Sequence, residues 1–396
     1  MASATGDRTK PLSLWRPAAA GLSASLIGIG LARFAYTPLI PALIAAGWFA
    51  PSAAAYLGAA NLAGYLAGAL LARPCAARTG AVGMLRAGMV LAVAGFFACA
   101  VPVSFLWYFL WRFVAGFSGG VLMVLAAPTV LPHVPPARRG LVGGAIFTGV
   151  GLGIALSGTL VPLLLRFGLG LTWCALGGLA AALTLLGWSG WPHAPRPARA
   201  ATVGPAPHGL PLLALYGEYA LNAVGLVPHM VFLVDYIARG LGEGVARGAQ
   251  YWVVFGLGAV CGPSIAGHVA DRIGFARALR LAFVLEAASV GLVAVATGPA
   301  ALLVSSAVVG AFVPGIVGLV LGRAHELTHG ADGAQRAWSF ATIAFAAGQA
   351  VAAYAFSYLY AGGVDEALLF VLGAAALALA LLLDLAVPVV RRLSRR

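Results

Sequence analysis

The chain has 396 residues, of which 62% are apolar and 9% are charged, whereas charged residues make up about a quarter of a soluble protein. A net charge of +13 favours nucleic acid as a partner only in a soluble domain, and this chain is too apolar to be one. The composition excludes a soluble enzyme, a nucleic-acid-binding protein and a disordered scaffold, and it indicates a membrane protein.

Long apolar stretches recur along the whole chain. A helix needs about 20 apolar residues to cross a hydrocarbon core about 30 Å thick. Apolar stretches separated by turn residues and charges predict an all-α membrane protein with twelve transmembrane helices. The predicted helices are 17–45, 53–72, 84–102, 106–131, 141–165, 169–190, 211–237, 249–269, 279–297, 299–322, 338–361 and 367–389.

Positive charge is distributed unevenly between the two sides of these helices. Of the 24 basic residues, nineteen lie near the termini or in loops that follow an even-numbered helix, while Arg166, Arg239 and Arg247 lie on the opposite side. Because basic residues accumulate on the cytoplasmic side, we expect both termini in the cytoplasm and the chain in a bacterial inner membrane. No cleavable signal sequence is evident, and the four cysteines include no CxxC pair.

The chain divides near its middle. Residues 191–210 are dense in proline and small residues, and we expect a cytoplasmic linker there between six-helix bundles at 1–190 and 211–396. Three pairs of residues share an offset of 194, namely Gly80 with Gly274, Gly116 with Gly310 and Thr148 with Thr342. A shared offset indicates a parallel duplication of a six-helix unit.

Short motifs accompany this duplication. The loop after the eighth helix reads GHVADRIGFARALR, its N-terminal copy reads ARPCAARTGAVGMLR, and the fourth helix contains RFVAGFSGG. These motifs resemble those of the major facilitator superfamily. GIGLARFAYTPLIP at 28–41 and YGEYALNAVGLVPHMVFL in the seventh helix more narrowly resemble its YbfB/YjiJ-type bacterial branch. The resemblance implies two pseudo-symmetric six-helix bundles that rock around a central site, and it supplies no substrate.

The resemblance also implies a conformational gate at the loop motifs. The Asp271 carboxylate would engage a helix N-terminus and neighbouring arginines in one orientation of the halves. The N-terminal copy has Ala77 where an acidic residue is expected. The residues assigned to the gate are Asp271, Arg272, Gly274, Arg277, Arg78 and Gly80.

Ionisable residues inside predicted helices are functional candidates, because a charge at the bilayer centre costs about 2.5–3.5 kcal/mol on insertion scales. The seventh helix is the most informative, since Glu218, Asn222, Gly225 and His229 share one face. Glu218 is our first choice of proton carrier, and His229 is a second titratable group. Glu286 in the ninth helix ranks lower, because that helix is peripheral to the cavity in the superfamily.

Two arginines are candidates for binding substrate. The planar guanidinium of Arg33 suits a carboxylate or phosphate, although an internal pair with Glu218 is an equal alternative. Arg112 either binds substrate or stabilises the N-terminal half. The residues predicted to contact substrate are Arg33, Tyr36, Thr37, Arg112, Thr148, Asn222, His229, Thr342 and Gln349.

One motif competes in another functional class. His325, Glu326 and His329 lie in HELTH, which matches the H-E-x-x-H zinc motif of a membrane-embedded hydrolase. On a helix this spacing puts both imidazoles on one face. No third ligand is identifiable from spacing, and the motif falls at the cytoplasmic end of the tenth predicted helix. We therefore prefer a transporter and expect no metal or other cofactor.

These features together predict a secondary active transporter and not an enzyme. Two arginines against one central carboxylate and a histidine favour an anionic or zwitterionic organic solute, with protons as the coupling ion. Proton-coupled export of amphipathic compounds is the alternative. The expected partners are a small-molecule substrate, protons and the lipid bilayer, with no nucleic acid, and we expect a monomer.

Overall fold

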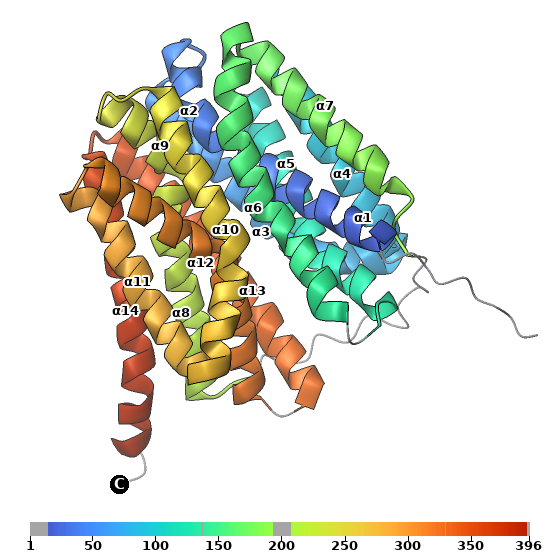
Figure 1. The fold of residues 1–396 in the computed structure, drawn as a ribbon, viewed down its shortest axis with the longest axis vertical. Helices are drawn as coiled ribbons and strands as arrows, with labels where there is room; N and C mark the ends of the chain where they lie inside the picture. Colours follow the sequence, from blue (N-terminus) through green and yellow to red (C-terminus); the bar gives the residue numbers. More distant parts are fainter. Residues whose placement is uncertain (1–14, 136–137, 193–206, 329, 394–396) are drawn as a thin grey trace, which may run out of the picture.

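The structure, a computed structural model, describes residues 15–135, 138–192, 207–328 and 330–393, and these form helices and no strand. Twelve helical spans in this part of the chain are long and apolar enough to cross a membrane. This confirms the predicted all-α fold (Figure 1). The spans are numbered here in chain order.

Span 1 comprises α1 (Trp15–Ser25), the π-helix η1 (Leu26–Leu31) and α2 (Tyr36–Ala45). Span 7 comprises α8 (Leu210–Val227), the π-helix η5 (Pro228–Phe232), α9 (Leu233–Asp235) and a second π-helix, η6 (Tyr236–Gly240). The other helices are α3 (Pro51–Thr79), α4 (Ala81–Ala98), α5 (Phe105–Val130), α6 (Arg139–Leu164), α7 (Leu169–Trp188), α10 (Val245–Ile273), α11 (Phe275–Val295), α12 (Pro299–Leu327), α13 (Gly330–Ala361) and α14 (Glu366–Leu393). Short 3-10 turns, η2 (Leu131–His133) and η4 (Leu165–Phe167), extend spans 4 and 5.

Several helices extend beyond their predicted ends. The prediction stopped at 72 and 269, but α3 continues to Thr79 and α10 to Ile273. Arginine and alanine are good helix formers, so the helix outlasts the apolar stretch that marks the membrane. A single glycine then joins each pair of helices, Gly80 with φ +87° and Gly274 with φ +84°, a conformation that glycine adopts without strain. Arg78, Asp271 and Arg272 therefore lie in helix ends and not in loops.

The duplication is visible in helix packing. In the N-terminal half a Cβ at Gly116 would lie 1.8 Å from the Asn61 carbonyl oxygen, and one at Gly68 would lie 2.1 Å from that of Phe117. The C-terminal half repeats both contacts with numbers higher by 194, at Gly310 with Phe255 and at Gly262 with Ala311. Glycine thus allows the backbones of α3 and α5 to approach closely, and it allows the same close approach between α10 and α12. The two halves are pseudo-symmetric.

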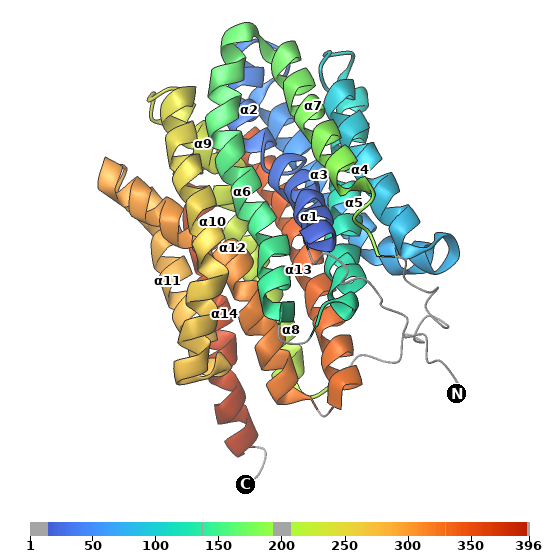
Figure 2. The ribbon, with the colours of Figure 1, turned by 45° about the vertical axis from the view of Figure 1, so that its right-hand side comes forward.

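The two halves meet along two pairs of helices. The α3 helix packs on α13, and α6 packs on α10, where a Cβ at Gly256 would lie 2.4 Å from the backbone nitrogen of Ala155. Figure 2 shows α6 and α10 side by side along this boundary. The proposed linker at 191–210 falls largely outside the described residues, since 193–206 are among those not described.

Candidate functional site

Spans 1 and 7 are interrupted near their middles. In span 1 the π-helix η1 is followed by a turn at 32–35, which contains Arg33, and the α-helix resumes at Tyr36. In span 7 the π-helix η5 begins at Pro228, whose missing N–H leaves the Val224 carbonyl without its α-helical partner. Irregular backbone at membrane depth persists only where neighbouring groups satisfy it, and π-segments are frequent at functional sites.

Side chains from spans 2 and 4 support the turn in span 1. The Ala32 carbonyl accepts a hydrogen bond from Arg112 Nη1 at 2.8 Å, and Asn61 Nδ2 lies 3.5 Å from the same oxygen. Asn61 Nδ2 also donates to the Arg112 carbonyl at 3.1 Å. The close α3–α5 crossing at Gly116 holds Asn61 and Arg112 together. Asn61 was not predicted, although a lone asparagine in an apolar helix is a signal that could have found it.

Both arginines are buried and lack an acidic partner. Arg33 is 9% exposed and Arg112 2% exposed, and neither forms an ion pair within the described part of the chain. The Arg112 guanidinium lies over the Tyr36 ring at 4.2 Å, and that of Arg33 lies 5.3 Å from the Tyr65 ring. The Nε atoms of both arginines have no hydrogen-bond partner. The alternative of an Arg33–Glu218 pair is therefore wrong for this conformation.

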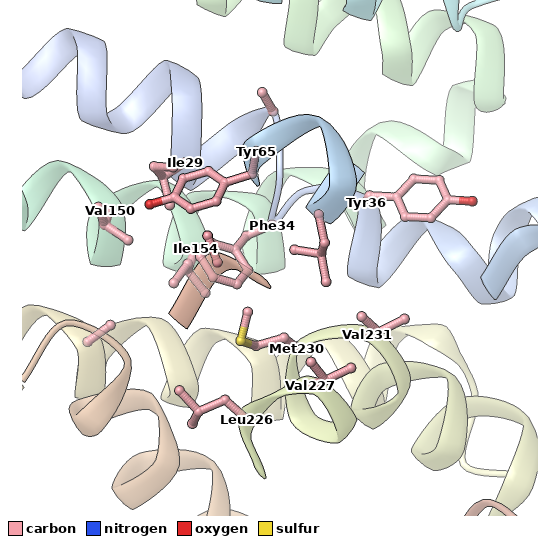
Figure 3. Packing of buried hydrophobic residues seen from close by; sticks show 14 of the residues in the cluster. Ile29, Phe34, Tyr36, Tyr65, Val150, Ile154, Leu226, Val227, Met230 and Val231 are labelled. Carbon is pink, nitrogen blue, oxygen red and sulfur yellow. The ribbon is translucent and has the colours of Figure 1, made fainter. Parts of the chain in front are cut away.

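Met230 of span 7 contacts the arginine region from the other half. Its backbone carbonyl accepts a hydrogen bond from Thr37 Oγ1 at 2.6 Å. Its sulfur lies 3.8 Å from Arg33 Nη2 and 3.6 Å from Gln349 Nε2. Figure 3 shows Met230 beside Phe34 and Ile154 of the N-terminal half. No sequence signal distinguished Met230 from other apolar residues of this helix.

A small cavity lies at this junction. It holds about 20 Å³, which is enough for one water molecule, and residues of both halves line it. Its polar lining comes from Arg33, Tyr36, Thr37, Asn61 and Arg112, and Met230 and Val231 line it from span 7. The cavity therefore presents two cationic side chains and several hydrogen-bonding groups to one small space.

The structure brings together only part of the predicted substrate set. Arg33, Tyr36, Thr37 and Arg112 line the cavity, and Gln349 reaches Met230 beside it. The remaining predicted residues do not line it and bond elsewhere: Thr148 to the Gly144 carbonyl, Thr342 to the Trp338 carbonyl, Asn222 to Glu286, and His229 to Ser305.

The polar face of span 7 points into the C-terminal half. A Cβ at Gly225 would lie 2.9 Å from the Gly373 carbonyl, so α14 packs tightly on this face. Asn222 Nδ2 donates to Glu286 Oε2 of α11 at 2.7 Å, and His229 Nε2 lies 2.7 Å from Ser305 Oγ of α12. Glu218 is 2% exposed and makes no hydrogen bond with any described residue. The shared face was predicted, but its direction was not.

The residues assigned to the gate lie at helix ends on the side of the chain termini. Asp271, Arg272, Arg277 and Arg78 are exposed. None of these four side chains makes a hydrogen bond or ion pair with the described residues. The contact expected between Asp271 and neighbouring arginines is therefore absent from this conformation, and the gating role stays a prediction.

The zinc interpretation of HELTH is not supported. The α12 helix ends at Leu327, and Thr328 is extended with φ −121° and ψ 155°, so the segment does not continue the helix that would align His325 with His329. His329 itself lies outside the described residues. Glu326 pairs with Arg323 at 2.8 Å. Within the described ranges no group of three or more potential metal ligands occurs.

Comparison with known proteins identifies the family of this chain. A search of curated proteins finds no match. A family model described as the uncharacterised MFS-type transporter YbfB matches residues 25–385, which include all twelve spans at least in part. The chain therefore belongs to the YbfB-type family of major facilitator superfamily transporters, and it is a multi-pass membrane transporter and not an enzyme.

Proposed function

We propose that this chain is a proton-coupled secondary transporter that moves a small anionic or zwitterionic organic solute across the bacterial inner membrane. The observation that carries the proposal is the pair of buried arginines, Arg33 and Arg112, which lie beside one cavity between the halves and have no acidic partner among the described residues. Both chain termini lie in the cytoplasm in this proposal.

Burial makes the charges of Arg33 and Arg112 energetically costly. An unpaired buried charge is strongly destabilising unless hydrogen bonds or a counter-charge offset it. Arg112 has the Ala32 carbonyl and the Tyr36 ring, whereas the hydrogen-bond acceptor of Arg33 is the Met230 thioether, a weak one. A carboxylate is a stronger acceptor for a guanidinium than either group. An anionic ligand that displaces Met230 and so enlarges the cavity would therefore give both guanidinium groups a charged acceptor.

The same contacts connect binding to movement. Thr37 and Arg33 of the N-terminal half hold Met230 of the C-terminal half, so a ligand that displaces Met230 changes the contact between the halves. A ligand shifts a conformational equilibrium by its differential affinity for the two states. The interrupted spans 1 and 7 line the cavity and contact each other across the boundary between the halves. This arrangement supports alternating access as the transport mechanism.

The test is electrical and uses the full-length chain in liposomes. Carboxylates, amino acids and lipophilic cations are applied in turn under an imposed pH gradient, and the charge movement is recorded for the wild type, Arg33→Gln and Arg112→Gln. Arg247→Gln is the matched control, because Arg247 is an exposed arginine with an ordinary surface partner, Glu243.

The proposal predicts currents with one class of carboxylate or amino acid that Arg33→Gln and Arg112→Gln abolish and Arg247→Gln preserves. Currents that require the pH gradient support proton coupling. Currents with lipophilic cations that are insensitive to Arg33→Gln would contradict the proposal and favour the export of amphipathic compounds.

A further inference from the structure

We propose that Glu286 of α11 is the residue that binds and releases the coupling proton, at a buried site that it forms with Asn222 of span 7. This inference rests on the proton-coupled transport proposed above and assigns its proton site. The sequence favoured Glu218 for this role, and the geometry points to Glu286.

Glu286 occupies the interior of the C-terminal half. Its side chain is 0% exposed, as is that of Asn222. Asn222 Nδ2 donates to Glu286 Oε2 at 2.7 Å, while Glu286 Oε1 and Asn222 Oδ1 have no hydrogen-bond partner. The carboxyl group therefore receives one hydrogen bond where an ionised carboxylate can accept about four.

No cation of the described part of the chain pairs with this carboxyl group. The helices packed against α11 are α8, α10, α12 and α14. Arg280 of α11 pairs with Asp384 of α14, and Arg323 of α12 pairs with Glu326. The other titratable or charged groups described on these spans, none of which hydrogen-bonds or pairs with Glu286, are Tyr216, Glu218, Tyr219, His229, Asp235, Tyr236, Arg239, Arg247, Tyr251, Cys261, His268, Asp271, Arg272, Arg277, His325 and Glu366.

The protonated form is the one that this environment accommodates. An ionised Glu286 would be a buried charge with a single donor, whereas a protonated Glu286 leaves one neutral hydroxyl without a partner. Burying one hydroxyl without a partner costs much less free energy than burying an uncompensated charge. Releasing the proton therefore requires that water or another donor reach Glu286, which is a change in the packing of the C-terminal half.

His229, the other titratable residue on the polar face of span 7, makes a structural hydrogen bond to Ser305. Ser305 Oγ donates its one hydrogen to the Ser289 carbonyl at 2.6 Å. It can then only accept from His229, so His229 Nε2 carries the hydrogen in that 2.7 Å contact. The His229 Nδ1 atom has no partner in a site bounded by the Phe255 and Phe370 rings. A second proton on this ring would point into apolar surroundings.

Span 7 connects this site to the arginine cavity. Asn222 and Met230 lie on the same span eight residues apart, or about 12 Å at 1.5 Å per residue. Asn222 contacts Glu286 of its own half, and Met230 contacts Arg33 and Thr37 of the other half. A displacement of span 7 when a ligand replaces Met230 therefore acts directly on the hydrogen bond to Glu286.

Infrared spectroscopy tests the proton site without any substrate. The full-length protein in lipid vesicles is taken stepwise from neutral to alkaline pH, and the carbonyl stretch of protonated carboxylic acids is followed. Exposed carboxyl groups are ionised at neutral pH and do not contribute. The variants are Glu286→Gln, Glu218→Gln as the matched buried control, and Asn222→Leu, which removes the one donor to Glu286.

The proposal predicts a protonated-acid band at neutral pH that disappears at alkaline pH. Glu286→Gln removes one component of this band, and Glu218→Gln preserves that component, although Glu218 is itself buried and contributes a component of its own. Asn222→Leu moves the Glu286 component to higher frequency, since a hydrogen bond to the acid carbonyl is lost, and this shift gives the answer if Glu286→Gln does not fold. A band that Glu286→Gln leaves unchanged, a Glu286 component that is lost in Glu218→Gln, or a band that persists throughout the alkaline range overturns the proposal. None of these outcomes depends on whether the transport assay finds a solute.

Discussion

Buried charges in this protein divide into two kinds. Asp235 is 1% exposed but holds Arg239 through two 2.6 Å hydrogen bonds and accepts a third from Tyr360 at 3.0 Å. Arg33 and Arg112 are also buried but have only neutral acceptors. Structural charges in a membrane are normally paired. We therefore expect a ligand to supply the charged acceptor that Arg33 and Arg112 lack among the described residues.

The buried serines provide a prediction at this scale. Ser305→Ala removes both the acceptor for His229 and the donor to the Ser289 carbonyl, so it should destabilise the fold by about 1–2 kcal/mol. Ser306→Ala is the control, because Ser306 is equally buried and its hydroxyl has no partner. Thermal unfolding in detergent measures both. Equal unfolding midpoints for the two variants would refute the hydrogen-bond chain through Ser305.

At the scale of elements, the interruptions in spans 1 and 7 bring the site together. The turn at 32–35 frees the Ala32 carbonyl for Arg112, and the π-helix after Pro228 presents the Met230 carbonyl to Thr37. Regular α-helix would use these carbonyls internally. The site therefore depends on backbone irregularity that costs stability, which is a common compromise in functional regions.

Pro228→Ala tests this dependence. The substitution restores an N–H that can donate to the Val224 carbonyl, so span 7 should become more regular, with unchanged or higher thermal stability and reduced transport. Pro388→Ala near the exposed end of α14 is the control and should leave transport unchanged. Unfolding midpoints and transport currents are measured on the same preparations. Full transport activity in Pro228→Ala would show that the irregular backbone is dispensable.

At the scale of the whole molecule, several contacts between the halves lie toward the side away from the chain termini, while on the other side Arg73 Nη1 of α3 donates to Ser339 Oγ of α13 at 3.3 Å. Thr37 bonds to Met230, Trp252 Nε1 donates to Ser157 Oγ at 3.2 Å, and a Cβ at Gly158 would lie 2.8 Å from the Val253 side chain. Each of these residues is in the part of its span farthest from the termini. The rocking of the halves that we propose must break these contacts.

Cross-linking tests this movement. In a chain whose four cysteines are replaced, Tyr56→Cys with Tyr354→Cys places thiols across the boundary between α3 and α13, where the two rings are 6.3 Å apart. Tyr216→Cys with Phe340→Cys is the control, with rings also 6.3 Å apart but both within the C-terminal half. A short bifunctional thiol reagent should stop transport in the first pair and not in the second. Continued transport by the first pair after complete cross-linking would exclude rocking at this boundary.

The sequence predicts spans well and their orientation poorly. Hydropathy located the twelve helices because membrane thickness determines how long an apolar stretch must be. Periodicity placed Asn222 and His229 on one face, but only the packing of Gly225 against α14 shows that this face turns away from the cavity. Arg33 and Arg112 were found because charge is rare in such helices. Met230 was missed because an apolar residue in an apolar helix carries no local signal.

The most direct test of the account is ligand-dependent thermal stability. A solute that binds only the folded protein raises its unfolding temperature in proportion to its binding. The purified wild type, Arg33→Gln and Arg247→Gln are heated with carboxylates, amino acids and lipophilic cations. The account predicts stabilisation of the wild type and Arg247→Gln by one class of carboxylate or amino acid, and loss of that effect in Arg33→Gln. Stabilisation by cations alone, or by an anion equally in Arg33→Gln, would contradict it.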